Sequence, residues 1–173
     1  MKVMEKSRSL LSELFWFVIK ALIIVLILIN FVFMSCVVNG SSMYPTYTEG
    51  DYGYSFIITR KLGIRRFDTA VIRADSSDRE KFLVKRVIGL PGETIEYRNN
   101  QLYVNGEYVE EPFLKDVTTQ DLKVTLAEDE FYCLGDNRNV SRDSRYYGPF
   151  KGESIVSTHL FVIYPFAAFG YHK

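Results

Sequence analysis

A serine held between a glycine and a proline begins the part of the chain whose residue types suit chemistry. Residues Gly40–Thr46 read GSSMYPT and follow a long apolar run. Glycine and proline favour a constrained turn, on which the hydroxyl and backbone N–H of Ser42 can point at a ligand. Serine is a common nucleophile in acyl transfer. Such compositions also occur in ordinary loops near a membrane exit, so this segment alone does not establish a function.

A lysine beside a second apolar run is a candidate base. Lys85 and Arg86 directly follow the sequence Phe82-Leu83-Val84. Because successive side chains of a strand face opposite sides, one of these two cations is expected to face inward. An inward lysine among apolar neighbours loses hydration, which favours its neutral form and makes it useful as a general base. The alternative is a solvated pair of charges at the end of a strand.

A polar segment lies further along the chain. Residues Gly135–Arg145 read GDNRNVSRDSR. This density of Asp, Asn, Ser and Arg is typical of a loop held by charge-assisted hydrogen bonds, although an ordinary polar loop has a similar composition.

Other functional classes find little support in the composition. Lys and Arg together number 21, as do Asp and Glu, so the formal net charge is zero, which argues against a nucleic-acid binder. Cys36 and Cys133 each lie in an apolar context and are expected to be buried thiols rather than a disulfide or a metal site. His159 and His172 offer no ligand cluster. We therefore expect neither a metal nor another cofactor.

The chain between Ala21 and Val38 has no charged residue, which predicts a membrane-spanning helix. Trp16 lies just upstream, where interfacial aromatic residues are common, and Lys20 can extend toward the headgroups. More positive charge precedes this run than immediately follows it, which places the amino terminus in the cytoplasm. We expect a cytoplasmic segment at residues 1–14, an anchor at 15–38 and an extracytoplasmic domain at 39–173. A cleaved signal peptide or a processed lipoprotein are the alternatives, but the run is long and no small-x-small site follows it.

The remainder predicts a mainly β domain. Residues 70–72, 82–84 and 160–164 form short runs with strand character, and residues 101–109 read as a hairpin around Asn105-Gly106. Residues 115–130 have weak periodicity, and we expect a surface excursion there.

The three polar segments, in this order after an apolar run, resemble the successive motifs of type I signal peptidases. The sequences Arg66–Ile72 and Ile163–Phe166 extend the resemblance toward the carboxyl terminus, although the family usually has Gly where this chain has Phe67. The small size and single anchor are similar to the Gram-positive-type branch. The resemblance implies a signal-peptidase-like β-barrel or β-sandwich catalytic domain on one amino-terminal transmembrane helix.

The resemblance also implies residue roles. Ser42 is the expected nucleophile, Lys85 its base and Ser141 the hydroxyl that orients the lysine. A supporting charge network is expected at Arg86, Asp143 and Arg145, with Asp136 and Asn137 shaping the loop. Some family members have a serine two positions before the nucleophile that binds the oxyanion; Gly40 stands there in this chain. The backbone N–H of Ser42 is therefore the expected oxyanion donor.

The expected function is the removal of signal peptides from exported preproteins by a membrane-bound serine endopeptidase, with the lipid bilayer and the secretion machinery as further partners. The resemblance places the substrate pockets at Val38, Met43, Val71, Leu83 and Val84. A self-cleaving repressor with a related domain would need a DNA-binding module, for which the sequence has no candidate. A non-catalytic or dedicated relative acting in pilus assembly is the other alternative.

Overall fold

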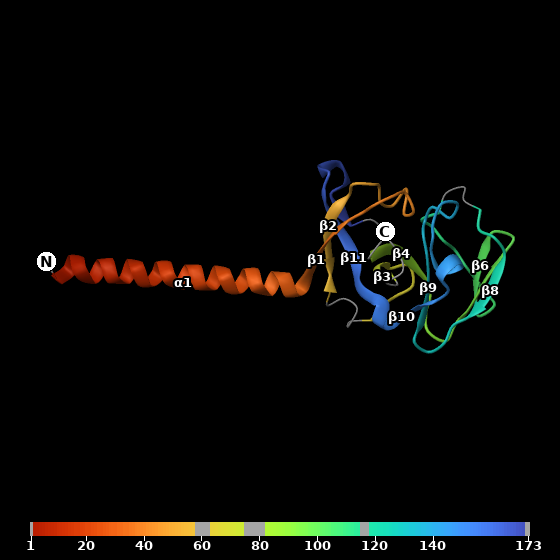
Figure 1. The fold of residues 1–173 in the computed structure, drawn as a ribbon, viewed down its shortest axis with the longest axis horizontal. Coiled ribbons are helices and arrows are strands. Elements are labelled where there is room, and N and C mark those ends of the chain that lie inside the picture. The colour runs from red at the N-terminus through yellow and green to blue at the C-terminus, as the bar shows by residue number, and fades with distance from the viewer. Residues whose placement is uncertain (1, 58–62, 75–81, 115–117, 172–173) are drawn as a thin grey trace. The chain divides into compact units, whose positions relative to one another are not determined.

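The computed structural model describes residues 2–57, 63–74, 82–114 and 118–171, without the side chains of residues 2–11 and 28–31. The chain divides into two units, residues 1–33 and residues 34–173. The elements, labelled in Figure 1, are α1 (Lys2–Val32), β1 (Phe33–Val37), β2 (Tyr52–Phe56), β3 (Thr69–Arg73), β4 (Phe82–Gly89), β5 (Thr94–Arg98), β6 (Gln101–Val104), β7 (Glu107–Val109), β8 (Leu122–Thr125), β9 (Glu130–Leu134), α2 (Ser144–Tyr147), β10 (Phe150–Lys151), η2 (Gly152–Ser154), β11 (Ile155–Tyr164), η3 (Phe166–Ala168) and β12 (Gly170–Tyr171).

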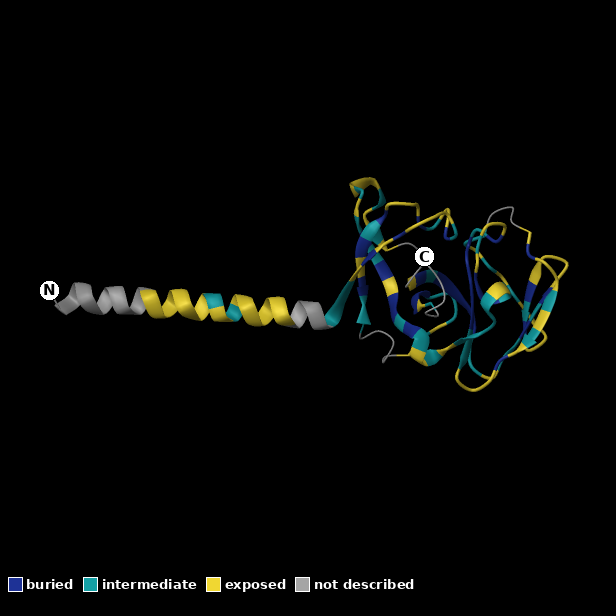
Figure 2. Cartoon of the chain, viewed as in Figure 1, coloured by how far each residue is buried: buried dark blue, intermediate teal, exposed yellow. Residues whose placement is uncertain are grey.

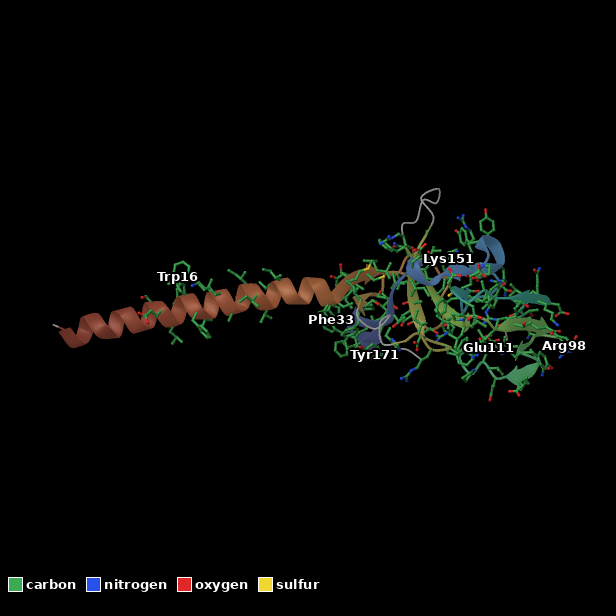
Figure 3. All side chains as sticks on the ribbon, turned by 90° about the horizontal axis from the view of Figure 1, so that it is seen from below. Trp16, Phe33, Arg98, Glu111, Lys151 and Tyr171 are labelled. Atoms are coloured by element: carbon green, nitrogen blue, oxygen red, sulfur yellow. The ribbon has the colours of Figure 1, made fainter. Side chains whose placement is uncertain are left out.

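The first unit is the helix α1. Its described side chains between Leu14 and Ile27 are mostly exposed and apolar (Figure 2), and Trp16 projects from the helix surface (Figure 3). Among the side chains described for this helix, no stretch reaches the length and apolarity of a membrane span. The uncharged run is not helical throughout, because the helix ends at Val32 and Phe33–Val37 form β1. The expected anchor boundary at Val38 therefore differs from the end of the helix.

The second unit is mainly β with curled sheets, as the sequence predicts. Among the described residues, the larger sheet has eight strands in the order β1-β2-β11-β3-β4-β9-β10, with β12 paired to β11. The described pairings in it, such as β3 with β4 and β11 with β3, are antiparallel. The predicted strands at residues 70–72, 82–84 and 160–164 correspond to β3, the start of β4 and the end of β11.

The smaller sheet has the order β7-β6-β5-β8. The predicted hairpin is confirmed: β6 and β7 pair around Asn105-Gly106, and both turn residues have a positive φ, as a two-residue turn of this kind requires. Figure 3 shows Arg98 on this sheet, at the opposite end of the β-rich unit from Tyr171.

The prediction of a surface excursion at residues 115–130 is wrong in part. Residues 115–117 lie outside the described residues, but Leu122–Thr125 form β8, which pairs with β5. Leu126 is 3% exposed and belongs to the core of this sheet. Leu122 and Val124 alternate with Lys123 and Thr125, and this short half-buried pattern was too brief to identify as a strand from sequence.

A second core cluster lies under the larger sheet and determines where the serine segment sits. Buried Cys36, Val38, Met43 and Tyr47 pack there with side chains from β3 and β11. Cys36 and Val38, near the end of the uncharged run, are therefore buried against protein, whereas Val37 between them is exposed, the alternation of a strand. Cys36 and Cys133 are both buried free thiols, as expected.

Close approach of β2 and β11 requires a glycine at position 53. A Cβ there would lie 2.1 Å from the backbone oxygen of Phe161, a contact that only a backbone shift could relieve. We predict that Gly53→Ala lowers the free energy of unfolding by about 1–3 kcal/mol, measured as a melting temperature several degrees lower. Gly152→Ala is the control, because its Cβ would first meet the Phe131 ring at 3.3 Å. An unchanged melting temperature for Gly53→Ala would contradict this packing.

Candidate active site

Ser42 lies in the connection between β1 and β2, and its neighbours in sequence anchor it. Met43 and Tyr47 are each 1% exposed, so the turn is fixed from the core side. The Tyr47 hydroxyl donates to the backbone oxygen of Leu160 over 3.2 Å, which ties the turn to β11. Ser42 itself is half-buried, so its hydroxyl remains accessible.

Lys85 lies within β4 and reaches the serine. Its side chain is 3% exposed, and its Nζ donates a hydrogen bond to Ser42 Oγ over 2.7 Å. Ala70 is its partner on β3 and is fully buried, so little water surrounds the amine. The contact places the amine within proton-transfer distance of the serine hydroxyl. This separation is one that a serine nucleophile with a lysine base would require, and the two roles stay a prediction here.

Arg86 is also buried, contrary to the expectation that only one of the two adjacent cations faces inward. It is 2% exposed and forms a bidentate pair with the fully buried Asp136, with distances of 2.8 and 2.7 Å. Its Nη1 donates to the Phe67 carbonyl over 2.8 Å, and its guanidinium lies 4.1 Å from the centre of the Phe113 ring. Simple alternation failed because both faces of β4 are covered by protein at this point.

The loop at residues 135–145 contacts the serine segment directly. The Asn137 N–H donates to the Ser42 carbonyl over 3.0 Å. Gly135 makes this approach possible, because a Cβ there would lie 2.4 Å from the Ser42 carbonyl oxygen and 2.2 Å from Ser141 Oγ. The predicted loop residues are thus brought together with the nucleophile.

Asp143 and Arg145 hold the same loop from behind. Two hydrogen bonds of 2.8 Å join the carboxylate of Asp143 to the guanidinium of Arg145, and the Gly135 N–H donates to Asp143 over 3.0 Å. Burial alone raises the pKa of Asp143, but these hydrogen bonds outweigh it, so its pKa lies below the ordinary value.

Ser141 lies beside this network. Its Oγ is buried, and no hydrogen bond of normal geometry to it is found within the described residues, although the nearby hydroxyl adds to the lowering of the pKa of Asp143. The structure brings Ser141 close to Gly135 and the Ser42 backbone. Its role in orienting Lys85 stays a prediction.

The amino-acid sequence is similar to those of known proteins. The family described as signal peptidase, peptidase S26, matches residues 11–164. The chain belongs to this family. Signal peptidase I S of Bacillus subtilis (strain 168) is 36% identical over 94% of this chain and 93% of its own. Signal peptidase IB of Staphylococcus aureus (strain MRSA252) is 33% identical over 88% of each chain. The solved signal peptidase I of Enterococcus faecalis V583 is 36% identical, with a TM-score of 0.49 over 55% of this chain and 95% of that one.

A groove of about 350 Å³ adjoins the serine and lysine of this signal peptidase family member. Val38, Met43, Leu83 and Val84, four of the five predicted pocket residues, line it. Val71 is not among the lining residues; it is 1% exposed and packs in the same core cluster as Val38 and Met43. Sequence reasoning missed several further lining residues, namely Met34, Ser35, Cys36, Val37, Asn39 and Phe82.

The described residues bear on two features of the site, the hydrogen-bond donor at the Ser42 backbone and the possibility of a bound metal ion. No hydrogen bond from the Ser42 N–H is found among them, and its role as the oxyanion donor stays a prediction. In the same part of the chain, no group of three or more His, Cys, Asp or Glu side chains is arranged to hold a metal ion. His159 is exposed at a bulge of β11, and its Nε2 lies 3.1 Å from Asp68 Oδ1. No contact between His159 and Ser42 or Lys85 is found among the described interactions.

The network around Asp143 predicts a pH dependence of stability. Because folding lowers its pKa from the model-compound value of 3.8, the ionised carboxylate stabilises the fold above about pH 4. That contribution is lost as the pH falls through the lower pKa of the folded state. We predict that Asp143→Asn is less stable than the wild type at pH 7 and that the difference shrinks toward pH 3. Urea unfolding at pH 7, 4 and 3 measures this, and a constant difference would refute the assignment.

Proposed function

We propose that the chain is a type I signal peptidase that removes amino-terminal signal peptides from exported preproteins, with Ser42 as nucleophile and Lys85 as general base. The observation that supports this most directly is the 2.7 Å separation of Lys85 Nζ and Ser42 Oγ at a buried lysine beside an open groove. The relatives compared above are signal peptidases, which supports the substrate class.

The proposed reaction proceeds through an acyl-enzyme. Lys85 accepts the proton of Ser42 as Oγ attacks the scissile carbonyl, and the resulting oxyanion accepts a hydrogen bond from the Ser42 N–H. The protonated Lys85 then donates to the leaving amine, which releases the mature protein. Lys85 next activates a water molecule that hydrolyses the ester, releases the signal peptide and restores Ser42.

Open strand edges support binding of an extended peptide. Among the described residues, β1 ends the larger sheet, and pairing of β4 with β9 starts only at Arg86. Residues of β1 and residues 82–85 also line the groove. A substrate segment can add there as a strand, with backbone hydrogen bonds for affinity and side-chain pockets for selectivity.

The proposed location is the outer surface of the bacterial cell membrane. The uncharged run that begins at Ala21 and the exposed apolar side chains of α1 between Leu14 and Ile27 support an anchor, and the basic residues near the amino terminus support a cytoplasmic start. The bilayer and the secretion machinery are then the partners that deliver substrate.

A non-catalytic relative acting in pilus assembly is a weaker alternative. Such a protein has no need for a nucleophile and a base held at hydrogen-bond distance, whereas Ser42 and Lys85 are both present and in contact.

The first functional test concerns the dyad. Ser42→Ala and Lys85→Ala should each lower preprotein cleavage by on the order of 10³-fold or more, and the double variant should lose little beyond either single change, because the two groups act as a unit. Cleavage by the detergent-solubilised full chain is followed on gels. His159→Ala is the control and should retain activity. Substantial activity in Lys85→Ala would overturn the mechanism.

The second test concerns selectivity. We expect the branched side chains of Val38, Leu83 and Val84 to form shallow subsites within the groove, so the wild type should cut after alanine and reject Phe or Lys. Val84→Ala should admit somewhat larger residues, with discrimination changed by about 1–3 kcal/mol. Sequencing the products from a preprotein library varied at the first and third positions before the cut measures this. Val109→Ala, in the smaller sheet, is the matched control. Ready cleavage after Phe or Lys by the wild type would contradict both the pocket and the function.

A further inference from the structure

The hydroxyl of Thr46 lies where three parts of the site meet. It donates a hydrogen bond to Asp136 Oδ2 over 2.5 Å and accepts one from Arg86 Nη2 over 3.2 Å. Thr46 lies four residues after Ser42, in the same turn. The hydroxyl therefore joins the segment that bears the nucleophile to a buried ion pair behind it.

Each partner of this hydroxyl is adjacent in sequence to a group that contacts the nucleophile. Arg86 follows Lys85, whose Nζ lies 2.7 Å from Ser42 Oγ. Asp136 precedes Asn137, whose N–H donates to the Ser42 carbonyl over 3.0 Å. A displacement of the Arg86–Asp136 pair relative to the turn would change both contacts of Ser42 together.

We propose that Thr46 is a positioning residue, whose hydroxyl sets the register of the Ser42 turn against β4 and the loop at residues 135–145. It touches neither the substrate nor the reacting atoms and acts only through Arg86 and Asp136. This inference deepens the proposed function and rests on it for the assay of cleavage.

The expected effect is on catalysis rather than on substrate binding. Thr46 is not among the residues that line the groove, so removal of its hydroxyl leaves the binding surface unchanged. Misplacement of a reacting group by about 1 Å can cost about 100-fold in rate. Thr46→Val keeps the shape of the side chain but loses the hydroxyl, and we expect kcat to fall about 10- to 100-fold with KM within about 2-fold. Thr46→Ser, which restores the hydroxyl, should return kcat to near the wild-type value.

The chain offers a matched control in the same turn. Thr48 also donates its hydroxyl to a buried aspartate, with Thr48 Oγ1 3.0 Å from Asp51 Oδ1, but it contacts neither Arg86 nor Asp136 in the described interactions. Thr48→Val should therefore retain wild-type kcat even if its melting temperature falls as much as that of Thr46→Val. Equal losses of kcat in the two variants, or a Thr46→Val enzyme with normal kcat, would overturn the proposal.

A double-variant cycle tests whether Thr46 acts on kcat through Asp136. In an Asp136→Asn background the Thr46 hydroxyl has lost its charged acceptor, so adding Thr46→Val should lower kcat by less than about 2-fold further. A full additional loss would show that Thr46 acts by another route and would overturn the proposal.

A second readout distinguishes failure of this inference from failure of the proposed function. Acylation of Ser42 by p-nitrophenyl acetate, followed by the intact mass of the full chain, needs the dyad but no preprotein recognition. If the wild type is acylated but does not cleave preproteins, the substrate assignment fails, and slower acylation of Thr46→Val than of Thr48→Val still supports the positioning role. If the wild type is neither acylated nor able to cleave preproteins, both proposals fail.

Discussion

The structure depends on the burial of two adjacent cations in one strand. Lys85 and Arg86 are 3% and 2% exposed, and an unpaired buried charge is costly in free energy. The two residues meet this constraint differently. Arginine stays protonated under all ordinary conditions, so Arg86 requires the fully buried carboxylate of Asp136 on the other side of β4. Lysine can lose its proton, and the Lys85 amine donates a hydrogen bond to Ser42 Oγ over 2.7 Å.

This division of roles explains why the polar loop must fold tightly against the sheet. Asp136 pairs with Arg86, the Asn137 N–H donates to the Ser42 carbonyl and Asp143 accepts from the Gly135 N–H, so one short segment neutralises Arg86 and contacts the Ser42 turn. The smaller sheet contributes as well. Arg138 donates from Nε to the Gly135 carbonyl over 3.0 Å, and its Nη1 contacts the Tyr97 hydroxyl over 2.9 Å. The loop is thereby fixed from two sheets, which suits a site whose distances must not drift.

Much of the architecture was predictable from local patterns. The hairpin at Asn105-Gly106 follows from turn chemistry, and β3, the start of β4 and the end of β11 follow from short apolar runs. The end of the uncharged run was not predictable, because strand and membrane helix share the same apolar composition and only the burial of Cys36 and Val38 against other segments distinguishes them. Motif order selected Ser42 and Lys85, which the structure places in contact, whereas the contacts of Thr46 and Phe113 were missed. Their contacts join segments far apart in the sequence, and no local pattern marks such contacts. Phe67, where the resemblance expects glycine, has a φ of 71°, so the backbone needs glycine-like geometry there even though the residue is bulky.

The two open strand edges beside the groove have a consequence for the accuracy of the cut. Side chains of a bound strand alternate between its two faces, so a slip of one residue turns every small side chain away from its pocket. A slip of two residues restores the same alternation and costs only the mismatch of individual side chains. For a substrate that binds as the proposed added strand, misprocessed products would therefore differ from the correct one by an even number of residues, because the pleat of the sheet sets which side chains face the pockets.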